Sequence, residues 1–198
     1  MKRPVLYILV LVVVAVASYF LFFKEKKEER GPKDKPLTVL ENTGPFNESY
    51  SKMLSAYFQL KDALVESDTT KANLAAAALL QAADSLKVDD IKGDSTGAIK
   101  ATARDYALSI NGSAKAIQGE ATLEAKRKEF EMVTDMIWNL TRTVRYNGQK
   151  VYYHFCPMAF NNKGAYWMST EREIKNPYFG SKMLTCGSVE DSLDYAKP

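Results

Sequence analysis

The chain has 198 residues, of which 46% are hydrophobic and 26% are charged, and it contains two cysteines and one histidine. This composition is typical of one modest globular domain with an extension. The net charge of +3 arises from residues 1–30, which carry six of the 27 basic and three of the 24 acidic side chains. The electrically balanced remainder sets aside nucleic-acid-binding proteins, and two cysteines are too few for a disulfide-rich scaffold or a four-cysteine zinc site.

Residues 1–30 are predicted to be a membrane anchor with a charged flank. Residues 4–23 are uncharged and mostly apolar, and a helix of that length, rising ~1.5 Å per residue, spans the ~30 Å of a bilayer core. We therefore expect one transmembrane helix. The alternative is a cleaved signal peptide with its cleavage site at Ala15 to Ala17, although the apolar run continues to Phe23.

Two opposing signals bear on the orientation of this helix. More basic residues follow the apolar span than precede it, which by itself places the body of the protein in the cytoplasm. A single N-terminal segment of the export type and a redox-sensitive site near the C-terminus favour the outside. We expect the body to lie outside, with secretion after signal cleavage as the alternative.

Residues 31–45 are predicted to be a tether and residues 46–146 a helical bundle. The tether contains three prolines and two glycines without a regular period, a composition typical of semi-extended linkers. Apolar residues then recur every three or four positions in four segments, at residues 50–64, 70–86, 99–117 and 123–146. Short connections between such segments favour an antiparallel four-helix bundle.

The bundle is expected to have a structural role. Asn47 or Ser49 is predicted to cap its first helix. Met53, Met132 and Met136 lie at helical spacing and are expected to fill the core rather than to bind a metal. The sequence has no Glu-x-x-His pair for a di-iron site.

Residues 147–190 are predicted to be a small module of strand and turns that packs on the bundle and carries the chemistry. The β-branched and aromatic run at residues 149–155 predicts a strand, on which His154 and Cys156 share one face. Pro157 donates no backbone hydrogen bond and is expected to end the ladder. Two turns follow before the second cysteine.

Two cysteine and methionine pairs stand about thirty residues apart in this module, Cys156 with Met158 and Met183 with Cys186. Thiolates and thioethers are soft ligands that select Cu(I) over hard cations, and imidazole is compatible with the same ion. We therefore expect a Cu(I) site formed by these four side chains, with His154 as a fifth contact.

A disulfide between Cys156 and Cys186 is the alternative interpretation. Two cysteines in an oxidising compartment usually pair, and closing a loop of this length would stabilise the fold by roughly 3 to 4 kcal/mol. The protein would then be a structural or protein-interaction module without a metal. An enzyme is not expected, because Cys156 and His154 are the only candidate nucleophile and base and no acid is placed to orient the imidazole.

The C-terminal motifs resemble those of an uncharacterised bacterial exported family, a domain of unknown function. The similarity covers about residues 45 to 190, and its specific positions are Cys156, Pro157, Met158, Gly164, Trp167, Asn176, Pro177, Tyr178, Gly180, Met183, Cys186 and Gly187. The family occurs behind an export signal and also fused to periplasmic adaptor subunits of heavy-metal efflux pumps. The Cys-Pro-Met piece is also similar to metal-binding modules of copper transporters, although Ala159 and Phe160 stand where those modules have His-Pro.

This resemblance implies an exported protein connected with soft-metal handling. Together with the chemistry of the residues, it predicts a single-pass protein of the bacterial inner membrane with its body in the periplasm. The predicted function is to buffer Cu(I) or to deliver it to an efflux or resistance system. The implied partners are the inner membrane, through the N-terminal helix, and a heavy-metal efflux pump or its adaptor.

Overall fold

The computed structural model describes Val12, Tyr19 and residues 42–196. The chain divides into two units, Met1–Pro36 and Leu37–Pro198, so residues 42–196 all belong to the second. Among the described residues, no helix is both long and apolar enough to cross a membrane. The predicted span at residues 4–23 lies outside the described residues, apart from Val12 and Tyr19.

Four long helices occupy the segments in which helical spacing was found, and they make the protein mainly helical. They are α2 (Gly44–Val65), α3 (Thr69–Asp84), α4 (Ala98–Gly119) and α5 (Leu123–Val144). The first begins with Pro45 in its first turn, where a missing N–H costs nothing. Its cap differs from the prediction: the Thr43 side chain, rather than Asn47 or Ser49, accepts a hydrogen bond from the Phe46 N–H.

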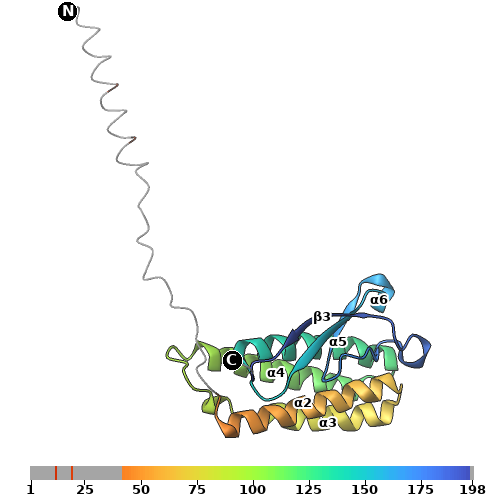
Figure 1. The fold of residues 1–198 in the computed structure, drawn as a ribbon, viewed down its shortest axis with the longest axis horizontal. Coiled ribbons are helices and arrows are strands. Elements are labelled where there is room, and N and C mark those ends of the chain that lie inside the picture. Colours follow the sequence, from red (N-terminus) through yellow and green to blue (C-terminus); the bar gives the residue numbers. More distant parts are fainter. Residues whose placement is uncertain (1–11, 13–18, 20–41, 197–198) are drawn as a thin grey trace, which may run out of the picture. The chain divides into compact units, whose positions relative to one another are not determined.

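The helices pack antiparallel as a bundle (Figure 1). Consecutive helices are neighbours, and α2 and α5 close the bundle through tyrosines of α2. The Tyr50 hydroxyl lies 2.7 Å from the Thr141 hydroxyl, and the Tyr57 hydroxyl lies 2.8 Å from that of Thr134. Because the later tyrosine meets the earlier threonine, the two helices run in opposite directions.

Methionines of the bundle differ in burial. Met53 is fully buried, and Met136 packs partly buried against the core, as expected for packing residues. Met132, however, is 52% exposed, so its predicted place in the core is wrong. It lies on the outer side of α5, because the apolar stripe of that helix is formed by its neighbours Val133 and Met136.

A three-stranded antiparallel sheet follows the bundle, with the strand order β2-β1-β3. The strands are β1 (Val151–Cys156), β2 (Ala165–Ser169) and β3 (Ser188–Leu193). The predicted strand is therefore confirmed as β1, at the centre of the sheet, and the ladder ends before Pro157. The third strand was not predicted, because its residues are mostly polar and exposed and show no apolar alternation.

Three short helical turns complete the described elements. They are η1 (Val88–Asp90), α6 (Ala159–Asn162) and η2 (Gly180–Lys182). In α6, Phe160 and Asn161 have left-handed backbone angles, so this segment reverses the chain between β1 and β2 rather than forming a regular helix.

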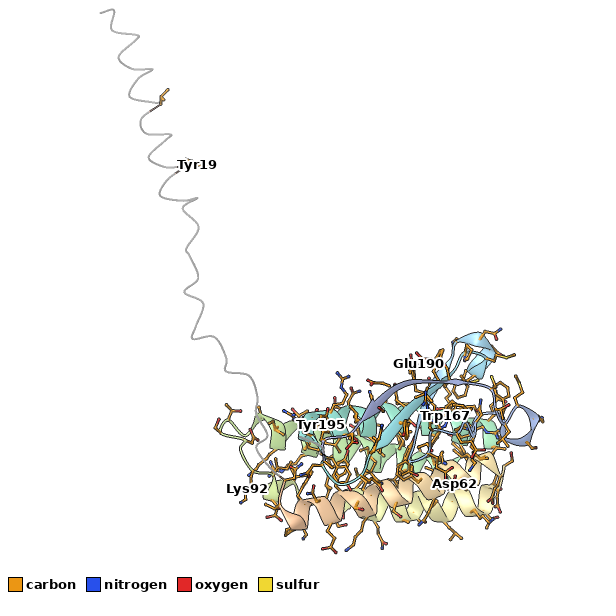
Figure 2. All side chains as sticks on the ribbon, viewed as in Figure 1. Tyr19, Asp62, Lys92, Trp167, Glu190 and Tyr195 are labelled. Carbon is orange, nitrogen blue, oxygen red and sulfur yellow. The ribbon has the colours of Figure 1, made fainter. Side chains whose placement is uncertain are left out.

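The two faces of the sheet have different covers. On one face, the Tyr153 ring stacks on Trp138 of α5 with centroids 4.1 Å apart, which fixes the sheet against the bundle. The other face carries His154, Cys156 and Trp167. His154 and Cys156 lie one and three positions beyond Tyr153 on the strand, and Trp167 pairs with His154 across the ladder. Trp167 is fully buried there, whereas Glu190 on β3 is exposed (Figure 2).

Candidate thiol site

The two thiols of the chain lie together at the end of the central strand. Cys156 is the last residue of β1 and is fully buried, and Cys186 is half-buried in the segment that leads into β3. Their Sγ atoms are 3.1 Å apart and are not covalently bonded. The pKa of the Cys186 thiol is raised mainly by its hydrogen bond with Cys156 and, to a smaller extent, by burial. Residues thirty positions apart thus form one dithiol site.

Asn176 holds the segment that carries Cys186. This residue is fully buried, and its side-chain amide donates to the Cys186 carbonyl at 2.7 Å. Its side-chain oxygen accepts from the Tyr178 N–H at 2.8 Å, and its own N–H donates to the Leu184 carbonyl at 2.8 Å. The sequence marks Asn176 only as one of the positions that carry the family resemblance, whereas in the structure it ties both ends of the segment together.

The same segment is anchored to the helices and to the sheet. Arg127 of α5 donates from Nε to the Pro177 carbonyl at 2.6 Å and from a terminal nitrogen to the Leu64 carbonyl at 3.0 Å. The Tyr178 hydroxyl donates to the Tyr166 carbonyl on β2. Arg127 was not singled out in the sequence, because a charged residue on a helix surface gives no sign of a partner fifty positions away.

Two glycines allow the close approach of this segment. Gly187 has a φ of +146°, and a Cβ on it would stand 2.8 Å from both the Phe155 carbonyl oxygen and the Trp167 ring. Gly180 has a φ of +57°, and a Cβ there would stand 2.7 Å from the Val65 carbonyl oxygen. Both positions therefore require glycine, and the first of them holds Cys186 against the strand that carries Cys156.

His154 lies on the same face of β1 as Cys156 and is fully buried. Its ring meets Trp167 edge to face with centroids 5.1 Å apart, and neither of its ring nitrogens has a hydrogen-bond partner. Burial, with a smaller effect of the Lys61 ammonium, lowers the pKa of His154 to about 4. The imidazole is therefore neutral at pH 7.

His154 is not gathered with the cysteines into one ligand cluster. Within residues 42–196 and at the two described N-terminal positions, no three His, Cys, Asp or Glu side chains are grouped so that they could hold a metal ion. The structure thus brings together the two thiols, while the imidazole packs among aromatic rings.

The two predicted methionine ligands flank the thiols in the chain. Met158 follows the strand in a turn and is 46% exposed. Met183 is half-buried, and its carbonyl accepts a hydrogen bond from the Cys186 N–H at 3.1 Å. Met183 and Cys186 therefore share one tight turn. Met158 does not continue the strand face of Cys156, because the strand ends at Cys156, before Pro157.

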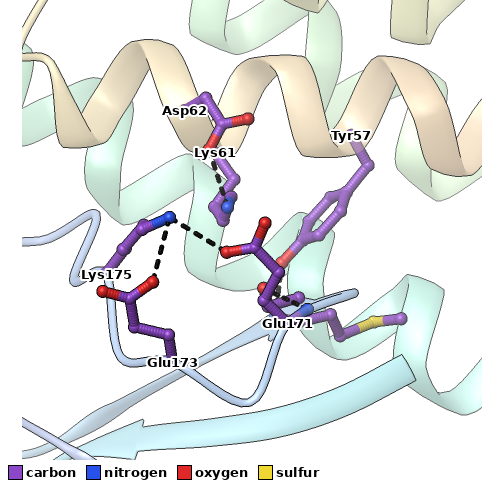
Figure 3. Close-up of polar contacts among 8 residues, drawn as sticks. Tyr57, Lys61, Asp62, Glu171, Glu173 and Lys175 are labelled. Atoms are coloured by element: carbon purple, nitrogen blue, oxygen red, sulfur yellow. Dashed lines mark hydrogen bonds and ion pairs between the residues drawn. The ribbon is translucent and has the colours of Figure 1, made fainter. Parts of the chain in front are cut away.

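A seam of polar contacts lies where α2 meets β2 and the chain that follows it (Figure 3), and one of these contacts joins α2 to the sheet. The Tyr57 hydroxyl accepts a hydrogen bond from the Met168 N–H at 2.9 Å, and the buried Lys61 pairs with Asp62 at 2.6 Å. Beside them, the Lys175 ammonium lies 2.9 Å from Glu171 and 3.3 Å from Glu173. This last group is largely exposed and contributes little, whereas the Tyr57 contact is buried and joins the sheet to the bundle.

The arrangement of the thiols permits two kinds of chemistry. A disulfide has a length of about 2.05 Å, so the sulfurs would have to approach. A metal with bonds to sulfur of about 2.3 Å could take both thiolates as ligands, and widening their separation would open the angle at the metal. The donor set of Cys156 and Cys186 is soft and fits a soft ion such as Cu(I) better than a hard cation.

The similarity to known protein families covers the helical bundle and does not include the two cysteines. Residues 53–148 match the model of a family described as "Protein of unknown function (DUF3347)". The match begins inside α2 and ends after α5, so it is consistent with an uncharacterised helical domain and stops short of Cys156. No curated protein and no solved structure matches the chain.

Proposed function

We propose that this protein binds Cu(I) through the thiolates of Cys156 and Cys186 and buffers the ion or delivers it to an efflux or resistance system. The observation that carries the proposal is the 3.1 Å separation of the two sulfurs, which come from distant parts of the chain. Thiolates are ligands that Cu(I) favours. The partial exposure of Cys186 gives the ion a route to the buried Cys156.

The two methionines complete the proposed ligand set. Met183 lies in the same turn as Cys186, and Met158 lies two residues beyond Cys156. Thioethers would add soft donors without adding charge. We leave His154 out of this set, because its ring is packed against Trp167 and is not clustered with the thiols.

The proposed cellular location rests on the transmembrane helix predicted at residues 4–23. We propose a single-pass protein of the bacterial inner membrane whose body lies in the periplasm, where a heavy-metal efflux pump or its adaptor would receive the ion. Secretion after signal cleavage is the alternative setting. The same thiol separation also favours a second candidate, a non-metal interaction module closed by a Cys156–Cys186 disulfide.

A Cu(I) titration of the reduced full-length protein in detergent, against a chromogenic Cu(I) chelator, tests the proposal. We expect one ion per chain, and loss of binding in Cys186→Ser. The double variant Met158→Ala with Met183→Ala should bind more weakly than the matched control Met132→Ala, which removes an exposed methionine of α5. Failure of the reduced wild-type protein to compete with the chelator would overturn the proposal and leave the disulfide-closed module.

A further inference from the structure

The two thiols of the dithiol site differ in access to reagents. Cys156 is fully buried at the end of β1, where its neighbours pair with a strand on each side. Cys186 is half-buried and lies in a turn whose neighbour Leu184 is 39% exposed. A reagent dissolved in water therefore meets Cys186 first, since thiol reactivity follows exposure as well as thiolate character.

The buried thiol is nevertheless in contact with the accessible one. The two Sγ atoms are 3.1 Å apart, and Asn176 and Gly187 hold the backbone of Cys186 in place. A group attached to Cys186 would thus have the Cys156 sulfur directly beside the new bond. No rearrangement of the helices is required for the second thiol to attack it.

We propose that Cys186 is a site of S-thiolation by low-molecular-weight disulfides and that Cys156 resolves the adduct. In the first step, the Cys186 thiolate attacks a disulfide RSSR, forms Cys186–S–S–R and releases one thiolate RS⁻. In the second step, the Cys156 thiolate attacks the Cys186 sulfur and displaces the second RS⁻. The protein loses two electrons and two protons, which RSSR takes up as two RSH, and a Cys156–Cys186 disulfide remains.

This reaction would regulate the site proposed above. The disulfide uses both thiolates, so the oxidised protein would hold no Cu(I) at these residues, and reduction would restore the site. That consequence rests on the proposed function. The thiolation itself does not, because both steps involve only the two cysteines and an external disulfide.

The experiment treats the reduced full-length protein with excess glutathione disulfide, without metal, and follows the intact mass. The wild-type protein should lose two hydrogens and accumulate no adduct. Cys156→Ser should keep one glutathione on Cys186, and Cys186→Ser should react at least about tenfold more slowly than Cys156→Ser while native. In denaturant, the two variants should react alike, which shows that structure causes the difference.

Two results would overturn the proposal. One is a lasting glutathione adduct on the folded wild-type protein, which would mean that Cys156 does not resolve it. The other is equal reaction rates for the two native serine variants. Circular dichroism checks that both variants are folded, and alanine variants replace them if serine unfolds the protein. Because no copper is present, neither result depends on Cu(I) binding, and the titration described above tests that separately.

Discussion

In the bundle, apolar side chains that recur every three or four residues hold the helices together, whereas in the C-terminal module a few polar side chains hold irregular backbone in place. The core residues of α2 to α5 are mostly alanine, leucine, isoleucine and aromatic residues with full burial. In the module, backbone groups are bound by the side chains of Asn176 within it, Arg127 of α5 and Tyr57 of α2. Packing in the first region is spread over many contacts, and order in the second depends on single residues.

This contrast indicates that the bundle determines the global stability of the protein, whereas the module determines the environment of the two thiols. A change in the bundle should lower the global free energy of unfolding and leave the native thiol site intact. A change in the module should have a smaller global effect and a larger effect on Cys186. The following variants test that separation.

The largest expected effect is that of Leu79→Ala in α3. Leu79 is fully buried, and the cavity left by its side chain should lower the free energy of unfolding by roughly 2–5 kcal/mol. The matched control Leu74→Ala, at an exposed position of the same helix, should change it little. Urea denaturation measures both. Faster alkylation of Cys186 in folded Leu79→Ala protein would show that the two regions are not separate.

The next effect is pH-dependent and comes from His154, the chain's one histidine. Burial lowers the pKa of His154 in the folded state to about 4. In the unfolded state the imidazole has its ordinary pKa of about 6.5, so between pH 6.5 and 4 the unfolded chain binds a proton that the folded chain does not. Stability should therefore be unaffected at pH 7 and fall as the pH drops from about 6.5 to 4, by at most about 3 kcal/mol. Urea denaturation at several pH values measures this slope.

His154→Leu is the matching variant, because it fills similar volume without a titratable group. Burial raises the pKa values of Glu131 and Asp135, and these carboxyls act with the opposite sign, so the difference between wild type and variant is the quantity to compare. The variant should lose the part of the slope due to the imidazole and be at least as stable at pH 7, since both ring nitrogens are unpartnered. An identical slope in both proteins would contradict the assignment.

A smaller global effect with a large local one is expected for Asn176→Ala. The variant leaves the Tyr178 N–H and the Cys186 carbonyl without their side-chain partner, which should cost about 2 kcal/mol. Native alkylation of Cys186 should become at least about tenfold faster, because its segment is no longer tied. Asn139→Ala, at an exposed position of α5, is the control, and equal alkylation rates in the two variants would refute the anchoring role.

The smallest expected effect is that of Tyr57→Phe, which tests the seam between the regions. Removing the hydroxyl leaves the buried Met168 N–H without its acceptor and takes away the hydrogen-bond partner of the Thr134 hydroxyl, which should cost about 1 kcal/mol. Tyr106→Phe, at a half-buried tyrosine of α4, should be nearly neutral. The measurement is again urea denaturation, and equal midpoints for the two variants would mean that the hydrogen bonds of the Tyr57 hydroxyl do not stabilise the fold.

The same contrast explains how much could be predicted from the sequence. The four helices and β1 were predictable because each buries one face, so that apolar residues recur in the sequence at the spacing of a helix or a strand. The strand β3 was not, because one edge of it is open and its exposed side chains carry no such pattern. The cap at Thr43 was missed because the helix begins earlier than its apolar stripe.

For the site, the sequence identified the two cysteines but not what holds them. Their residue type alone marked them as chemically special. The positions of Asn176 and Arg127 depend on contacts that span ten to sixty-three residues, and no local pattern encodes such partners. His154 was expected in the same cluster as the cysteines but is not grouped with them. Residues two apart on a strand share a face, but their side chains need not converge on one point.

The two tryptophans make the protein its own optical probe. Trp138 stacks on Tyr153 at the seam between α5 and the sheet, and Trp167 lies beneath Gly187, next to the turn that carries Cys186. With Trp138 replaced by phenylalanine, intrinsic fluorescence would report the surroundings of the thiols alone, and with Trp167 replaced it would report the seam. Thiol oxidation, metal uptake and loosening of the bundle could then be followed as separate signals, without any attached dye.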